Sequence, residues 1–83
     1  MIGDPRDLDS IGDDAYPGFA EQRELLRVAF GRLGLDCAQV WCDQYDEVIR
    51  SPQMFKASAT EKVEATMLIL MTWIKDHPRL LKN

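Results

Sequence analysis

The chain has 83 residues, of which 46% are hydrophobic and 29% charged, so its composition is that of a folded globular protein rather than a disordered one. This length allows one domain with a small core, which predicts low stability. The net charge of −4 lies in residues 1–16, where five aspartates face one arginine, while nine acids and nine bases cancel in the rest. A neutral body offers no basic stripe to a phosphate backbone, which argues against nucleic-acid binding.

Residues 1–17 are rich in glycine, proline and aspartate and show no sustained hydrophobic period. They predict an irregular acidic N-terminal segment. Part of this segment is expected to dock on the body through its apolar residues, Met1, Ile2, Leu8, Ile11 and Tyr16. The run from Asp7 begins like a calcium-binding loop, but its twelfth position is Gly18 instead of a bidentate glutamate, so we expect no metal there.

The first predicted helix covers about residues 18–33. Its apolar side chains recur at helical spacing and form a face that contains Phe19, Leu26, Phe30 and Leu33. Gly34 follows at the position where a glycine in the left-handed conformation commonly ends a helix. Gly31 lies inside the last turn, where a glycine costs about 1 kcal/mol relative to alanine, and this suggests that another helix approaches closely there.

The second predicted helix covers about residues 36–50, with Asp36 as its N-cap and Ser51-Pro52 as its end. Cys37 and Cys42 lie too far apart around this helix to form a disulfide. A short helical turn near residues 52–56 is expected next, because proline is favoured at the first helical position. We expect this turn to place Met54 and Phe55 in the core.

The third predicted helix covers about residues 59–76 and begins with the capping-box pattern from Ser58 to Glu61. His77-Pro78 ends it, and residues 78–83 form a short polar tail. The sequence thus predicts an all-α fold, a small bundle of three main helices with one short turn. We divide it into the acidic segment 1–17, a single helical domain 18–77 and the tail 78–83.

The third helix is apolar around most of its circumference. Its expected core stripe consists of Val63, Met67, Leu70, Met71 and Ile74. Ile69 and Trp73 form a second ridge, and Leu68 lies on the side that carries Glu61, Glu64, Thr72 and Lys75. Two interpretations follow for these surplus residues. Either the other helices and the N-terminal segment cover them within one chain, or they pack across an interface with another protein or a second copy.

Catalytic and metal-binding patterns are weak in this sequence. The single histidine, His77, stands at a helix end, where it is expected to interact with the last carbonyls. Cys37 and Cys42 lack the C-x-x-C spacing of zinc and redox sites. No local spacing assembles a nucleophile, a histidine and an acid. We therefore expect no enzyme, no cofactor and no metal.

The leading functional hypothesis is a non-catalytic regulator or inhibitor that binds another protein. The expected partner-binding residues are Leu68, Ile69 and Trp73 on the helix and Asp7, Asp9, Asp13 and Asp14 in the acidic segment, which would steer the chain toward a basic surface. The alternatives are a self-associating structural subunit, with a homodimer expected, and an accessory subunit of an enzyme. The apolar runs are too short to span a bilayer, and we expect a cytoplasmic protein without membrane contact.

Overall fold

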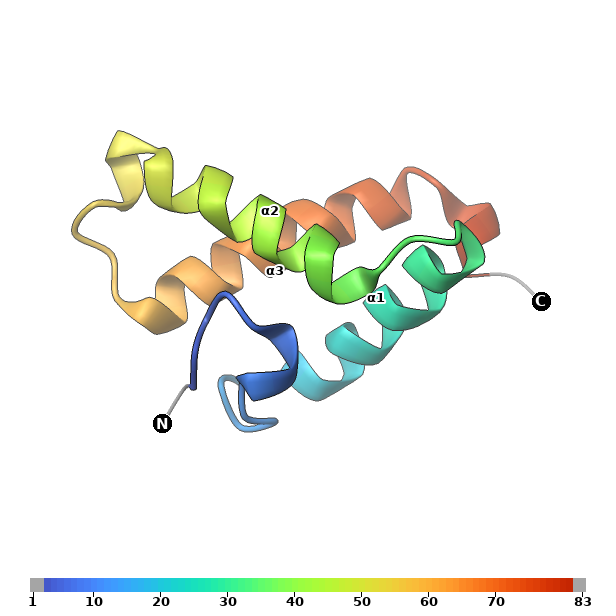
Figure 1. The fold of residues 1–83 in the computed structure, drawn as a ribbon, viewed down its shortest axis with the longest axis horizontal. Coiled ribbons are helices and arrows are strands. Elements are labelled where there is room, and N and C mark those ends of the chain that lie inside the picture. The colour runs from blue at the N-terminus through green and yellow to red at the C-terminus, as the bar shows by residue number, and fades with distance from the viewer. Residues whose placement is uncertain (1–2, 82–83) are drawn as a thin grey trace.

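The computed structural model describes residues 3–81, and Met1 and Ile2 lie outside that range. Three helices dominate it: α1 (Phe19–Arg32), α2 (Cys37–Arg50) and α3 (Ala59–Lys75) (Figure 1). Three short 3-10 helices accompany them: η1 (Leu8–Ser10), η2 (Pro52–Met54) and η3 (Pro78–Leu80). No strand occurs in residues 3–81. The predicted all-α class is confirmed, and each end of the three main helices differs from its predicted position by at most one residue.

The helix ends follow from local chemistry. The Asp36 carboxylate accepts a hydrogen bond from the backbone N–H of Ala38 at 3.0 Å and caps α2. Ser58 and Glu61 form the predicted capping box at the start of α3. Gly34 has a φ of 72° directly after α1, and the backbone bonds Gly34 N–H to Gly31 and Leu35 N–H to Phe30 complete a Schellman motif. Each of these signals is readable in the sequence alone.

The expected close helix approach at Gly31 is wrong. A Cβ added there would meet no atom within 4 Å, and the residue is exposed. The glycine therefore lowers the intrinsic stability of α1 without making room for a neighbouring helix.

Replacing Gly31 by alanine should raise the free energy of unfolding by about 0.5–1 kcal/mol, because alanine has less conformational freedom to lose in a helix. Gly34→Ala is the matched control: the same atoms are added in open space, but at a φ of 72°, which alanine rarely adopts. We expect G34A to destabilise by about 1 kcal/mol. Chemical denaturation measures both. Equal effects of the two variants would contradict this account of the end of α1.

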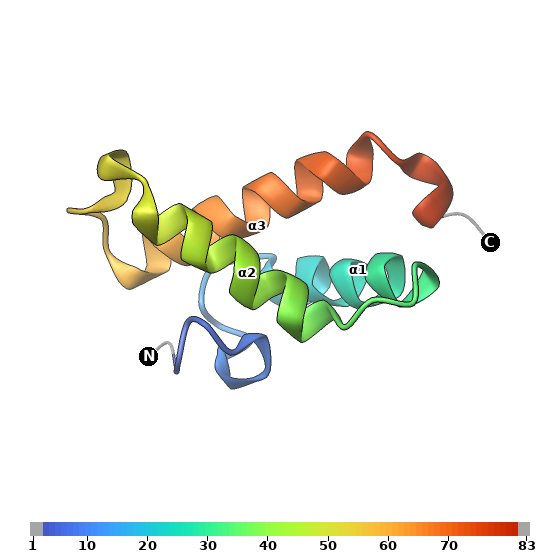
Figure 2. The ribbon, with the colours of Figure 1, turned by 45° about the horizontal axis from the view of Figure 1, so that its top comes forward.

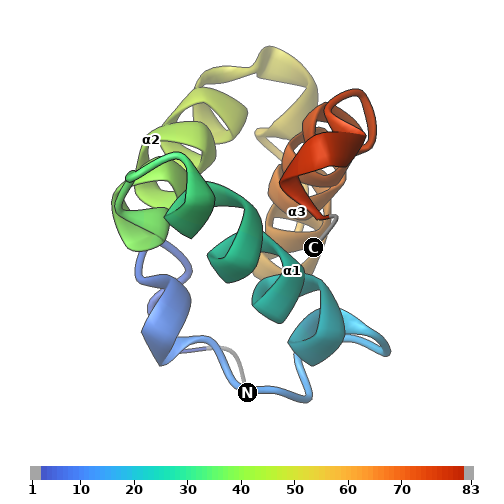
Figure 3. The same ribbon diagram turned by 90° about the vertical axis from the view of Figure 1, so that its right-hand side faces the viewer.

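The three helices enclose one core. α2 and α3 pack along each other, and α1 packs against both, with its C-terminal end near η3 (Figures 1 and 3). The fully buried side chains of highest volume are Trp41 of α2 and Phe19 of α1, whose rings meet edge to face with centroids 6.3 Å apart. The predicted core stripe of α3 is buried in full: Val63, Met67, Leu70, Met71 and Ile74 are all between 0% and 7% exposed.

The N-terminal segment supplies part of this core. Leu8 is 0% and Ile11 2% exposed, and both belong to the same buried cluster as the helices. The indole N–H of Trp41 donates a hydrogen bond of 2.8 Å to the carbonyl of Pro5. At the other end, Leu80 and Leu81 pack against the cluster. The described parts of the segment and of the tail therefore share one core with the helical body.

The turn after α2 differs from its prediction. It is shorter than expected, Pro52–Met54, and it does not carry both apolar side chains inward. Met54 is half-buried, while Phe55 is 67% exposed. The expectation that Phe55 enters the core is wrong, because the turn ends one residue before it and the chain then leads away to the capping box of α3.

Candidate protein-binding surface

The outer side of α3 presents three apolar side chains to solvent. Leu68 is 67%, Ile69 44% and Trp73 37% exposed. These are the apolar residues of α3 that the sequence places outside its core stripe. Leu68 is the most exposed of the three, and it projects from the middle of the longest helix. Other large apolar side chains of the described residues are also exposed, namely Leu25, Val28, Leu33, Leu35 and Phe55.

Leu68 stands between two hollows in the surface. One hollow has a volume of about 470 Å³, and Met67, Met71 and Tyr16 line it on one side of Leu68. The other has a volume of about 290 Å³, and Val48 and Ile69 line it on the opposite side. Met54, which is half-buried, and Ala65 line both hollows, so these two side chains form the surface next to Leu68. A ridge between two apolar hollows is a shape that packs against a second helix.

Charged residues lie around this ridge. Glu61, Glu64 and Lys75 line the first hollow, and all three belong to α3. Glu47 lines the second hollow and pairs with Arg50, with 3.3 Å between Oε1 and Nη1. The ridge is thus an apolar centre with a polar rim, which is the usual layout of a protein–protein contact.

Trp73 has a different environment from Leu68. Its ring stacks on Phe30 of α1, with centroids 5.4 Å apart, and on His77, with centroids 4.3 Å apart. It lines a third hollow of about 380 Å³ with Leu33 and Leu80, near η3. The two interpretations of the surplus face therefore apply to different residues. Neighbours within the chain cover much of Trp73, and they leave Leu68 open.

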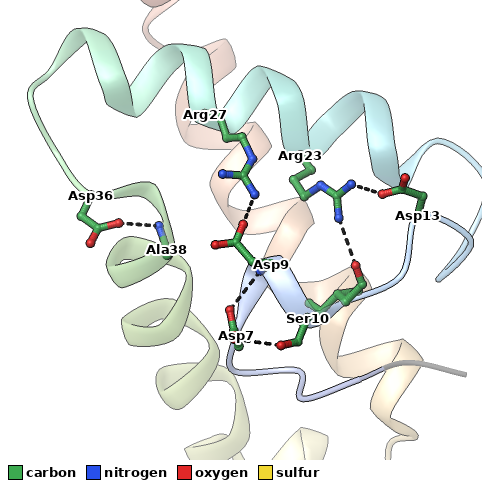
Figure 4. Close-up of polar contacts among 9 residues, drawn as sticks. Asp7, Asp9, Ser10, Asp13, Arg23, Arg27, Asp36 and Ala38 are labelled. Atoms are coloured by element: carbon green, nitrogen blue, oxygen red, sulfur yellow. Dashed lines mark hydrogen bonds and ion pairs between the residues drawn. The ribbon is translucent and has the colours of Figure 1, made fainter.

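The acidic residues of the N-terminal segment contact the chain itself (Figure 4). Asp9 forms an ion pair with Arg27, and Asp13 forms one with Arg23, both on α1. Asp7 accepts hydrogen bonds from the backbone N–H of Asp9 at 3.0 Å and from the Ser10 hydroxyl at 2.8 Å, which caps η1 (Figure 4). Three of the four aspartates predicted to bind a partner thus already have partners in this chain.

Asp14 has no such contact among the residues that the structure describes, and its side chain lies at a shallow hollow beside Pro17 and Gly18. A second link holds the segment to α2, where Arg6 pairs with Asp46 at 2.5 Å. The start of the segment, with η1, lies beside α2 (Figures 2 and 3), while Tyr16 near its end lines the first hollow together with residues of α3. The four predicted aspartates line neither hollow beside Leu68, although Tyr16 lines both the hollow of Asp13 and Asp14 and the first hollow beside Leu68.

The groups with potential chemistry have structural surroundings. His77 Nδ1 lies 2.8 Å from the carbonyl oxygen of Trp73, the interaction with the end of the helix that its position predicts. Cys37 and Cys42 are free and half-buried, and burial raises the pKa of the Cys37 thiol. Burial, helped by nearby Glu64, raises the pKa of Tyr16 to about 12, and its hydroxyl donates a hydrogen bond of 2.5 Å to Gln22.

Two further features bear on possible ligands. Within residues 3–81, histidine, cysteine and carboxylate side chains do not gather in any group of three that could hold a metal ion. Over the same residues, none of the helices has the length and apolarity to cross a membrane.

Sequence reasoning missed the residues that shape the hollows beside Leu68. Met54 of η2 lines both hollows, and no periodic pattern in the sequence reports its place there. Ala65 belongs to α3, three residues before Leu68, so helical spacing is the signal that could have found it. Phe55 was also missed as a surface residue. Its position outside the helical repeat, between η2 and the capping box, is the signal that could have placed it there.

The chain was compared with protein-family models, with curated proteins and with solved structures, and none of the three comparisons finds a match. Any functional conclusion therefore depends on the surface geometry described above.

Proposed function

We propose that this chain is a non-catalytic protein-binding module, a regulator or inhibitor, whose contact surface is the ridge of α3 centred on Leu68. The observation that carries the proposal is the exposure of Leu68: 67% of a leucine side chain is open to water between two apolar hollows. Covering the exposed two thirds of this side chain contributes about 1–2 kcal/mol to binding. A partner helix that fills the hollows gains further apolar contact from Ile69 and Met54.

The surroundings of the titratable groups support the non-catalytic part of the proposal. The thiol of Cys37 and the hydroxyl of Tyr16 both have raised pKa values, which disfavours their ionised, nucleophilic forms. The ring of His77 is stacked on Trp73 and directed to a backbone carbonyl. These contacts anchor the ends of helices, and none of them brings a base to a nucleophile.

The acidic segment has a secondary place in this proposal. Asp9 and Asp13 are paired with arginines of α1, and these positive charges offset part of the negative electrostatic potential of the segment. Steering by Asp7, Asp9, Asp13 and Asp14 toward a basic partner stays a prediction, as does cytoplasmic localisation. The same ridge would also serve a self-associating subunit or an accessory subunit of an enzyme, since each of these binds through an apolar helix face.

Site-specific photocrosslinking tests the placement of the surface. A photoreactive phenylalanine analogue in place of Leu68 should give covalent protein adducts when the full chain is irradiated in the cells that produce it. The matched control carries the same analogue at Glu24, an exposed position on α1. We expect adducts from position 68 and none from position 24.

The masses of the adducts give the partner, and twice the mass of the chain denotes a second copy. Adducts that form equally from both positions would come from nonspecific collisions with other proteins and would contradict the proposed surface. Their absence at position 68, in a variant that melts like the unmodified chain, would overturn the proposal.

A further inference from the structure

The outer face of α3 carries two opposite charges at equal spacing on either side of Leu68. Glu61 lies seven residues before Leu68, and Lys75 seven residues after it. Seven residues make almost two full turns, so all three side chains share one face, and each charge lies about 10.5 Å along the helix from Leu68. The charges at the two ends have opposite signs. Between them, four residues before and after Leu68, lie Glu64 and Thr72, which are both exposed.

This arrangement fits one kind of partner especially well. When two identical helices pack antiparallel about a two-fold axis, each residue before the axis faces the residue equally far behind it on the other helix. With the axis beside Leu68, Glu61 of each chain faces Lys75 of the other. We propose that a second copy of this chain binds the Leu68 ridge, with α3 antiparallel to α3 of the partner. This inference rests on the proposed function and names the partner at the same surface.

The apolar centre accommodates this pairing. The two Leu68 side chains meet at the axis, and because each has a hollow on both sides, they can lie side by side. Ala65 is half-buried beside Leu68, and its small side chain allows the two helices to approach closely. Ile69, 44% exposed, lies at the edge of the same contact. The contact is about four helical turns long, which suits a reversible dimer rather than an obligate one.

The charges select the direction of the pairing. In the antiparallel arrangement, the dimer contains two pairs between Glu61 and Lys75, and Glu64 faces Thr72 one turn away from the partner's Lys75. A parallel arrangement in register would place Glu61 against Glu61 and Lys75 against Lys75, which repel each other. Glu61 has an oxygen to spare for this purpose. Its capping-box bond to the Ser58 N–H uses only Oε1 and is 3.5 Å long.

Analytical ultracentrifugation of the full chain over a wide concentration range tests the proposal. Wild type should show reversible monomer–dimer association. Leu68→Asp brings two carboxylates together at the axis in place of two leucines, and we expect it to weaken the dimer at least about 100-fold. Lys75→Glu replaces two attractive pairs by two repulsive ones and should weaken it about tenfold. Lys56→Glu, the same charge change in the exposed loop before α3, is the control and should leave association unchanged.

The charge-swapped variant E61K/K75E gives the decisive result. It restores opposite charges across the two-fold axis, so its dissociation constant should return to within about threefold of wild type. E61K also removes the capping box, which costs α3 about 1 kcal/mol, so a restored dimer cannot come from a more stable helix. Thermal unfolding of each variant confirms that it is folded. Glu61→Gln, which can still form a capping box, should weaken the dimer slightly.

Three outcomes would overturn the proposal. The first is a wild-type chain that stays monomeric at every concentration up to about 1 mM, a range that covers the weak association expected of a small interface. The second is an E61K/K75E dimer as weak as that of K75E, and the third is an E61Q dimer tighter than wild type, which indicates parallel helices. If the chain is monomeric but position 68 crosslinks to another protein, the dimer is wrong and the proposed function stands. If position 68 gives no adduct at all, both are wrong.

Discussion

A chain shortened to begin at Ala15 should not unfold cooperatively. The deletion removes Leu8 and Ile11, which are 0% and 2% exposed, and it removes the Pro5 carbonyl that accepts the hydrogen bond of Trp41. Losing a buried leucine or isoleucine side chain costs about 2–5 kcal/mol. The whole domain is expected to be stable by only about 4–12 kcal/mol at this length. Two such losses therefore use up most or all of its stability.

Far-ultraviolet circular dichroism during heating measures this effect. The control keeps all 83 residues and replaces Asp7, Asp9, Asp13 and Asp14 by asparagine. Asparagine at position 7 can still cap η1, and the exposed ion pairs of Asp9 and Asp13 contribute at most about 1 kcal/mol each. We expect this control to melt cooperatively. A shortened chain with the melting temperature of the full chain would show that the segment is dispensable for folding.

Replacing Trp41 by alanine should lower the free energy of unfolding by about 3–5 kcal/mol. Trp41 is fully buried, contacts Phe19 edge to face, and links the core to the N-terminal segment through its indole N–H. The substitution leaves a large cavity where α1, α2 and the segment meet, and it leaves the Pro5 carbonyl without this donor. Trp41→Phe keeps an aromatic ring and should cost less, about 1–2 kcal/mol.

Guanidinium denaturation followed by circular dichroism gives these values without depending on tryptophan fluorescence. Trp73→Phe is the matched control, because the residue type and the change are the same but the ring is 37% exposed. It should cost less than about 1 kcal/mol, since phenylalanine can still stack on Phe30. If W73F destabilised more than W41F, the centre of the core would lie at α3 and η3 instead of at Trp41.

The positions of the two tryptophans show which parts of the candidate surface the sequence could predict. The helical repeat places Trp41 in a core stripe, and it is buried. The same repeat places Ile69 and Trp73 on one surplus ridge of α3, yet the Trp73 ring stacks on Phe30 and on His77. Leu68, one residue before Ile69, is the side chain left open. Periodicity assigns a residue to a side of its own helix, but the position of the neighbouring helices decides whether that side is covered.

Local interactions account for what the sequence by itself determined. The ends of α1, α2 and α3 depend on Gly34, Asp36 and the Ser58–Glu61 box, which act on backbone groups within a few residues, and so the helix ranges were predicted almost in full. The buried stripe of α3 was also predicted, because hydrophobic spacing is a property of a single helix.

Only the tertiary structure decided the rest. The exposure of Phe55, the open space at Gly31 and the pairing of Asp9 and Asp13 with arginines of α1 all depend on how segments distant in sequence meet. Packing between segments is not directional, so the sequence of one segment does not report which neighbour covers it. The sequence alone therefore shows that α3 carries more apolar residues than one core stripe needs, while only the structure shows the ridge at Leu68.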